Sequence, residues 1–322
     1  MTPRRVALLK GGPSLERQVS LRSAARVEDA LERLGIEFVS IDVGRTLVDD
    51  LRASDADVAF VALHGRGGED GTVQELLEIV GIPYTGSGVL ACMRCMDKVL
   101  TKHMLLEEGL PTPDFFAFSE IAFKELGAGE ALPAIEERLG FPVVVKPAAQ
   151  GSALGIKFAR AAEDVPEALI AAFSYDDRVL LERHVEGREL AVSVLEDEGE
   201  PRALPVVEAK PEQQYFYDFE ARYEIGKTEF LCPADLPGDV AARAHELAVA
   251  VYRLLGCYGF ARVDMILGDD GLQVLEAQAI PGLTDTSLLP QAAEAADITF
   301  EQLVEKMLEQ ALARTPASAT AG

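Results

Sequence analysis

The first 90 residues alternate short apolar segments with amphipathic ones, and this alternation limits the fold more than any other feature of the sequence. Segments 4–10, 36–43 and 57–65 have the apolar character of buried strands. Segments 20–35 and 72–81 have the pattern of helices. Strands separated by helices are typical of a parallel sheet with helices packed on its faces. We therefore expect an α/β fold that begins with a parallel-sheet domain.

The rest of the chain is long enough to add further domains. A chain of 322 residues exceeds what one compact core usually holds. We expect an N-terminal α/β domain at 1–95, a small central α+β domain at 96–182 and a C-terminal α+β domain at 183–313. We expect a disordered tail at 314–322. Within these domains we predict one continuous helix at 89–109 and one strand at 153–159. We predict a polar, aromatic-rich loop at 215–230.

The composition excludes several classes of partner. The formal net charge of −24 argues against nucleic acid or an anionic membrane. No apolar run approaches the roughly 20 residues that span a bilayer, and no signal-peptide core precedes the first strand, so we expect a cytoplasmic protein. Cys92 and Cys95 form a C-x-x-C pair. Because the second pair of a zinc site is missing, we expect thiols packed on a helix.

Two strand-like segments near the C-terminus carry charged and amide side chains at alternate positions. Arg262 and Asp264 share one face of the first, and Glu276 and Gln278 share one face of the second, because side chains two apart in a strand point the same way. Two structural ion pairs would explain Arg262 but would leave the carboxylates in excess. Buried carboxylates need a cation, so a metal ion is the alternative partner.

A strand that ends near Lys146 leads into a loop of small residues, and a second strand leaves that loop at once. We predict a flap between antiparallel strands. Gly151, Ser152 and Gly155 have little or no side chain, so backbone N–H groups of the loop can approach phosphate oxygens closely. Lys146 adds a positive charge beside them, which favours a nucleotide site.

Two other nucleotide-like patterns are weaker. GSGVLA at 86–91 fits a dinucleotide-binding turn, but no strand ending in an acidic residue follows within about 20 positions. IGKT at 225–228 imitates the end of a P-loop, but Ala221 stands where the first glycine is required.

Two glycine-rich loops each follow an expected strand. HGRGGEDG at 64–71 offers His64 and two carboxylates, but their spacing is not that of a metal site, and a tight loop against a ligand is favoured. LKGGPSLE at 9–16 places Glu16 at the start of a helix, where carboxylates are common for reasons of the helix dipole alone.

Eight stretches match, in order and spacing, the motifs of one family: GGPSLERQVSL, LHGRGGEDGTVQELLE, PYTGSG, MDKVLTK, KPAAQGSALG, YDFEARY, RVDMIL and PGLTDTSLLP. The chain apart from its tail resembles the D-alanine:D-alanine ligases of the ATP-grasp superfamily. The resemblance implies an ATP-grasp fold with a Rossmann-like N-terminal domain, a central lid and a C-terminal catalytic domain. It implies an ADP-forming ligase that joins two D-alanines through D-alanyl phosphate for peptidoglycan synthesis, and a homodimer.

The resemblance also implies a role for each candidate residue. The phosphates of ATP are assigned to Lys98 and Lys146. Its adenine and ribose are assigned to Glu182 and Glu189. Two Mg²⁺ or Mn²⁺ ions are assigned to Asp264, Glu276 and Gln278. The ammonium group of the first D-alanine is assigned to Glu16, with Ser152 and Tyr223 hydrogen-bonded to it. The tetrahedral oxyanion is assigned to Arg262 and the Gly282 N–H. The carboxylate of the second D-alanine is assigned to Ser287 and Leu288, with His64 nearby. The transferred phosphate is assigned to Arg222.

The sequence departs from the family's pattern at several of these positions. Gln278 stands where asparagine is usual, and its extra methylene moves a ligand oxygen by about 1 Å. Ala279 replaces a polar residue and Ala153 replaces a second serine. Arg222 replaces a lysine, which keeps the charge but changes its shape.

Two other functions remain open at this point. One is an ATP-grasp ligase with D-lactate or D-serine as acceptor, although the neutral phenol of Tyr223 suits an amine nucleophile. The other is an ATP-binding regulator whose catalysis is weakened at Gln278.

Overall fold

The structure is a computed structural model that describes residues 3–211 and 226–314. Its N-terminal unit is a three-stranded sheet in the order β2-β1-β3, with both pairs parallel, which confirms the expected parallel sheet. The elements are β1 (Arg5–Lys10), α1 (Arg17–Leu34), β2 (Glu37–Asp42), α2 (Leu47–Ser54), β3 (Val58–Val61) and α3 (Thr72–Val80). Every residue of β3 is buried, which explains its continuous apolar sequence.

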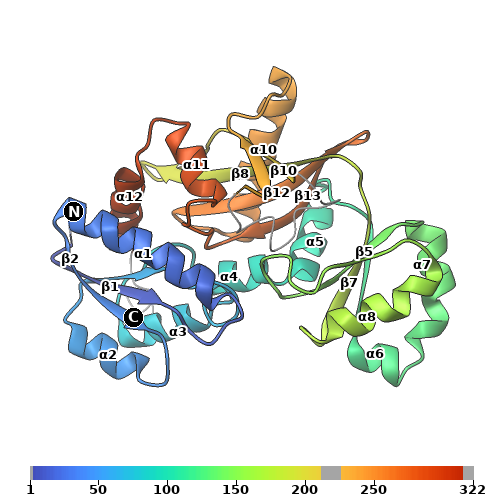
Figure 1. The fold of residues 1–322 in the computed structure, drawn as a ribbon, viewed down its shortest axis with the longest axis horizontal. Helices are drawn as coiled ribbons and strands as arrows, with labels where there is room; N and C mark the ends of the chain where they lie inside the picture. The colour runs from blue at the N-terminus through green and yellow to red at the C-terminus, as the bar shows by residue number, and fades with distance from the viewer. Residues whose placement is uncertain (1–2, 212–225, 315–322) are drawn as a thin grey trace.

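The prediction of one helix over 89–109 is wrong, because the chain breaks at Asp97. Two helices lie there, α4 (Val89–Met96) and α5 (Lys98–Glu107), and they run from the N-terminal unit toward the central one (Figure 1). The Asp97 carboxylate accepts hydrogen bonds from the N–H groups of Val99 and Leu100, at 2.9 and 3.0 Å. Asp97 is therefore the N-cap that turns the chain into α5.

The central unit is a four-stranded antiparallel sheet in the order β4-β7-β5-β6. Its elements are β4 (Phe115–Ser119), α6 (Glu120–Lys124), η1 (Ala128–Ala131), α7 (Leu132–Leu139), β5 (Val143–Pro147), β6 (Lys157–Ala159), η2 (Ala162–Asp164), α8 (Val165–Phe173) and β7 (Arg178–Arg183). The predicted flap between antiparallel strands is confirmed. β6 begins later than predicted because Ser152, Ala153 and Gly155 have positive φ, which ends an extended conformation.

The C-terminal unit is an antiparallel sheet in the order β11-β10-β8-β12-β13, with β9 paired to β8. Its elements are β8 (Arg188–Asp197), β9 (Glu200–Ala203), β10 (Val207–Pro211), β11 (Thr228–Leu231), α10 (Gly238–Leu255), β12 (Phe260–Gly268), β13 (Gly271–Gln278), α11 (Leu288–Glu294) and α12 (Phe300–Ala313). The end of the predicted loop at 215–230 belongs to β11, which pairs with β10. The predicted tail begins at Arg314, and 315–322 lie outside the described residues.

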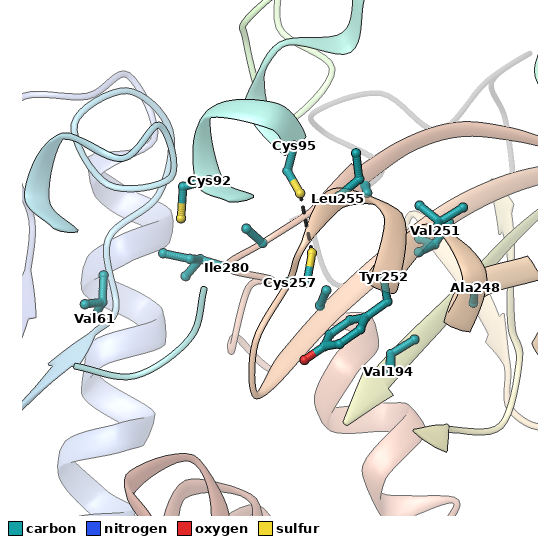
Figure 2. Close-up of a cluster of buried hydrophobic side chains, with 14 of the residues drawn as sticks. Val61, Cys92, Cys95, Val194, Ala248, Val251, Tyr252, Leu255, Cys257 and Ile280 are labelled. Carbon is teal, nitrogen blue, oxygen red and sulfur yellow. Dashed lines mark hydrogen bonds between the residues drawn. The ribbon is translucent and has the colours of Figure 1, made fainter. Parts of the chain in front are cut away.

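Two apolar clusters join the N-terminal and C-terminal units. One runs from Val61 of β3 through the α4 thiols to Tyr252 of α10 (Figure 2). The other joins α1 and β1 to α11 and α12. The central sheet instead packs on α7 and α8 in a cluster of its own. The two end units therefore form one packed body, and the central unit forms a second body beside it.

The cysteines of α4 are part of this core. Cys92 and Cys95 are buried and free, and the Sγ of Cys95 lies 3.7 Å from that of Cys257 (Figure 2). Burial raises the pKa of the Cys92 thiol above its ordinary value, which disfavours the thiolate that a metal needs. The expectation of packed thiols is confirmed.

Within 3–211 and 226–314, no helix combines the length and the apolar character needed to cross a membrane.

The N-cap at Asp97 generates a stability prediction. Asp97→Ala removes two capping bonds and the 3.0 Å ion pair with Arg178, so we expect the free energy of unfolding to fall by about 1 to 2 kcal/mol. Asp97→Asn keeps the capping oxygen and should lose about half as much or less. Urea denaturation measures both, and equal losses for the two variants would contradict a capping role.

Candidate active site

A cavity of about 1080 Å³ lies between the central and C-terminal sheets. Strands β5, β6 and β7 line one side, and β8, β10, β12 and β13 line the other. Six residues predicted from the sequence line it: Lys146, Glu182, Glu189, Asp264, Glu276 and Leu288. The two sheets thus bring five of the candidate nucleotide and metal residues to one partly open cleft.

A buried carboxylate between two lysines lies at one end of this group. Glu182 of β7 has its Oε1 2.6 Å from the Lys146 Nζ and its Oε2 2.6 Å from the Lys102 Nζ. Burial alone would raise the pKa of Glu182, but the field of both lysines holds that pKa below its ordinary value. Burial lowers the pKa of Lys102 to about 8, although the negative charge of Glu182 acts to raise it.

The acidic strand pair has the predicted geometry. β12 and β13 are antiparallel neighbours, with Arg262 opposite Gln278 and Asp264 opposite Glu276. Arg262 binds Asp264 through Nε and Nη2, at 2.6 and 2.7 Å. Glu276 pairs with Lys98, whose Nζ lies 3.1 Å from Oε2. The expectation that these carboxylates lack a counter-ion is therefore wrong, because α5 supplies one from a distant part of the sequence.

Whether β12 and β13 can bind a divalent ion therefore depends on which donor atoms their side chains offer. Asp264, Glu276 and Gln278 offer only carboxylate and amide oxygens, which are the ligands that Mg²⁺ prefers. Among the described residues, no three His, Cys, Asp or Glu side chains are grouped to bind a metal by themselves. The residues fit Mg²⁺ provided that phosphate or water oxygens complete the shell.

Glu16 lies at the junction of the N-terminal and central units. It is the N-cap residue of α1 and is 2% exposed. The Ser152 hydroxyl, from the flap, donates a hydrogen bond to its Oε2. A Cβ at Gly151 would lie 2.5 Å from its Oε1, so only glycine allows this approach. Burial and then the nearby charge of Glu69 raise the pKa of Glu16 to about 7.

His64 is held by hydrogen bonds on both ring nitrogens. Nδ1 lies 3.0 Å from the Glu69 carboxylate, and Nε2 lies 3.0 Å from the Ser23 hydroxyl. The same Ser23 oxygen accepts a hydrogen bond from the N–H of Leu283, at 3.1 Å. The imidazole is thus connected through Ser23 to the loop after β13.

That loop carries Gly282, Ser287 and Leu288. The Ser287 hydroxyl accepts the N–H of Thr284 at 2.9 Å, and a Cβ on Gly282 would lie 2.7 Å from the Ser287 oxygen. Ser287 precedes the first residue of α11, and the Leu288 side chain is buried in the core. Only the backbone N–H of Leu288 is therefore suited to a polar substrate group.

The two remaining candidates, Tyr223 and Arg222, lie outside the described residues. The structure thus groups the other fourteen predicted residues around two connected places. One is the cavity between the sheets, and the other is the junction of Glu16, His64 and the loop after β13.

Comparison with known proteins assigns this arrangement to a family. The family described as D-ala D-ala ligase C-terminus matches residues 104–309, and the one described as D-ala D-ala ligase N-terminus matches 44–87. A D-alanine–D-alanine ligase of Syntrophotalea carbinolica is 45% identical over 97% of this chain and 97% of its own length. The chain belongs to the D-alanine–D-alanine ligase family. It is therefore an ADP-forming ligase, as predicted.

Solved structures of this ligase family have the same fold. A D-alanine–D-alanine ligase of Bacillus anthracis superposes with a TM-score of 0.83, at 33% identity over 96% of this chain and 97% of that chain. The same enzyme complexed with ATP superposes with a TM-score of 0.81. A D-Ala:D-Ser ligase, VanG of Enterococcus faecalis, superposes with a TM-score of 0.80 at 26% identity, over 96% and 99% of the two chains. The ATP-grasp fold predicted from the sequence is confirmed.

Sequence reasoning missed three residues that the structure ties to the site. Lys102 pairs with Glu182, and it lies one helical turn after Lys98, a spacing that puts both lysines on one face of α5. Ser23 accepts the N–H of Leu283, and Arg26 donates to the Leu283 and Thr284 carbonyls, at 3.0 and 2.7 Å. No local pattern identifies Ser23 and Arg26, because their partners are more than 250 positions away.

The raised pKa of Glu16 generates a prediction with a defined sign. The folded pKa of about 7 exceeds the ordinary 4.5, so the ionised carboxylate increasingly costs stability as the pH rises from 4.5 to 7. Glu16→Gln removes that charge. We expect its stability advantage over the parent to grow by about 1 to 2 kcal/mol between pH 5.5 and pH 8.

Urea denaturation at the two pH values measures this difference. Glu32→Gln, at an exposed carboxylate of the same helix, is the matched control and should show no such growth. An advantage of Glu16→Gln that is the same at both pH values would contradict the assignment of the buried titrating group.

Proposed function

We propose that this chain joins two D-alanines to D-alanyl-D-alanine through D-alanyl phosphate, with ATP converted to ADP and phosphate, for peptidoglycan precursors. The names of its relatives support this reaction. A carboxylate is a poor electrophile, so an amine attacks it only after conversion to an acyl phosphate. The bound ATP of the Bacillus anthracis relative supports ATP as the phosphate donor.

The observation that carries the proposal is the position of Lys98. Its Nζ lies 3.1 Å from Glu276 and donates a hydrogen bond to the Gln150 carbonyl at 2.8 Å, one residue before the Gly151 that lies against the Glu16 carboxylate. An ammonium bound to Glu16 and a metal–phosphate group bound to Glu276 would therefore flank one cation. The carboxylate of the first D-alanine and the γ-phosphate would meet beside Lys98.

The side chains then divide the two chemical steps. Glu16, oriented by Ser152, binds the ammonium group of the first D-alanine. A carboxylate oxygen of that D-alanine attacks the γ-phosphorus of ATP. Lys98 and Lys146 offset the charge of the phosphates. Asp264, Glu276 and Gln278 would hold Mg²⁺, which would supply further charge compensation for the phosphates.

The second step forms the peptide bond. The amine of the second D-alanine attacks the acyl carbon, and phosphate leaves. Arg262 and the Gly282 N–H would stabilise the oxyanion of the tetrahedral intermediate. Ser287 and the Leu288 N–H, with His64 behind them, would bind the second carboxylate.

We propose D-alanine as the acceptor rather than D-serine or D-lactate. The relatives at 45% and 44% identity bear the D-alanine–D-alanine name, whereas VanG, a D-Ala:D-Ser ligase, is 26% identical. The roles of Tyr223 with Glu16, Arg222 with the transferred phosphate, and Glu182 and Glu189 with adenine and ribose are part of the same proposal.

We also propose a cytoplasmic homodimer with domains at 1–95, 96–182 and 183–313. The use of ATP supports the location. The separate apolar cluster of the central sheet supports the division, and the family resemblance supports the dimer.

The reaction generates a direct prediction. Phosphate should be released only when ATP, Mg²⁺ and D-alanine are all present, and mass spectrometry should detect D-alanyl-D-alanine. L-Alanine is the control and should give no product. ATP binding without phosphate release under these conditions would favour the weakened regulator instead.

The metal assignment generates a second prediction. Both carboxylates already have cationic partners, so we expect Mg²⁺ to bind mainly together with the nucleotide phosphates. Glu276→Gln should lower kcat by about 100-fold or more, and Gln278→Asn should lower the Mg²⁺ concentration at half-maximal rate because its shorter side chain suits the site. A Mg²⁺ titration of the three proteins tests this assignment, and parent-like activity of Glu276→Gln would contradict it.

A further inference from the structure

Lys102 is a fully buried lysine that the proposed reaction does not use. It has 0% exposure, and besides its 2.6 Å contact with Glu182 it donates a hydrogen bond to the Thr112 hydroxyl. Thr112 in turn donates to the carbonyl of Val274 on β13, at 2.8 Å. Lys102 therefore connects the carboxylate in the nucleotide cavity to the strand that carries Glu276.

The two lysines on Glu182 have different surroundings. Lys146 lines the cavity, where a nucleotide phosphate can reach it. Lys102 lies behind Glu182 on α5, with its Nζ 5.1 Å from the centre of the Phe115 ring, and has no exposed surface. Lys146 can change partner when a ligand arrives, whereas Lys102 has no route to a phosphate.

This difference matters because Glu182 is itself buried. An ionised carboxylate without solvent requires a cation, and removal of one partner from a buried pair is strongly destabilising. If Lys146 were the sole partner of Glu182, a phosphate could recruit Lys146 only by leaving that carboxylate uncompensated. The protein would then lose either the contact between Lys146 and the phosphate or the ionised state of Glu182.

We propose that Lys102 is a positioning residue for the nucleotide, the permanent counter-ion of Glu182. It releases Lys146 to the phosphates and keeps Glu182 as an ionised hydrogen-bond acceptor for the exocyclic amino group of a purine. The inference rests on the proposed function, which places ATP in this cavity. It adds to that function a residue that touches neither ATP nor D-alanine.

Steady-state kinetics of Lys102→Met test the proposal, because methionine keeps the length of the side chain and removes its charge. We expect KM for ATP to rise by about tenfold or more, with kcat changed less than about threefold and KM for D-alanine less than about twofold. Lys124→Met, at an exposed lysine of the central unit, is the matched control and should leave all three values unchanged.

Nucleotide selectivity separates this role from general destabilisation. Inosine triphosphate has a 6-oxo group where ATP has a 6-amino group, so an ionised Glu182 rejects it. Without Lys102 the carboxyl group is expected to protonate once Lys146 turns to the phosphates, and a protonated acid can donate to the 6-oxo group. The preference for ATP over inosine triphosphate should therefore shrink in Lys102→Met.

A second pair of variants covers the case in which Lys102→Met does not fold. In the Glu182→Gln background the carboxylate is gone, so adding Lys102→Met should change KM for ATP less than about twofold, since the two residues act as one unit. A further loss of tenfold in the double variant would overturn the proposal. So would a folded Lys102→Met with parent-like KM for ATP and unchanged selectivity.

The same measurements distinguish this inference from the proposed function. If Lys146→Met and Glu182→Gln both leave KM for ATP unchanged, the nucleotide does not bind in this cavity and the proposed function fails there. If those two variants lose ATP affinity and Lys102→Met does not, only the positioning role of Lys102 is wrong.

Discussion

The compensation of two carboxylates, one buried and one half-buried, by lysines from one short helix organises this site. Helix α5 carries Lys98 and Lys102 one turn apart, and the two side chains reach different sheets. Lys98 contacts Glu276 of β13, and Lys102 contacts Glu182 of β7. Because a buried carboxylate is costly without a cation, these contacts fix both walls of the cavity relative to one helix. The cap at Asp97 starts α5 where the lysines can do so.

The distribution of apolar packing explains why the site lies where it does. The N-terminal and C-terminal units share two apolar clusters, while the central sheet has its own. The cavity opens where these bodies meet, and the Ser152–Glu16 hydrogen bond crosses the same boundary. A substrate ammonium on Glu16 and a nucleotide between the sheets would therefore both lie beside the flap that carries Ser152.

Local patterns predicted part of this arrangement from the sequence. The alternation of side chains in two strands predicted that Arg262, Asp264, Glu276 and Gln278 share one space, because strand periodicity is a local property. The break at Asp97 was missed because capping competes with a helical pattern that continues on both sides. The Lys98–Glu276 pair was missed because it joins positions 178 residues apart. The roles of Glu16 and Ser287 came from resemblance alone, since a single carboxylate or hydroxyl carries no periodic signal.

If ATP activates the carboxylate of the first D-alanine beside Lys98, a carboxylate oxygen is transferred to phosphate, and following that oxygen tests the reaction most directly. D-Alanine labelled with ¹⁸O in its carboxylate is supplied with ATP and Mg²⁺, and the released phosphate is examined by ³¹P NMR. An acyl phosphate requires one carboxylate oxygen to leave with the phosphate, so the account predicts ¹⁸O-labelled phosphate in step with dipeptide formation. Dipeptide formed together with unlabelled phosphate would contradict it.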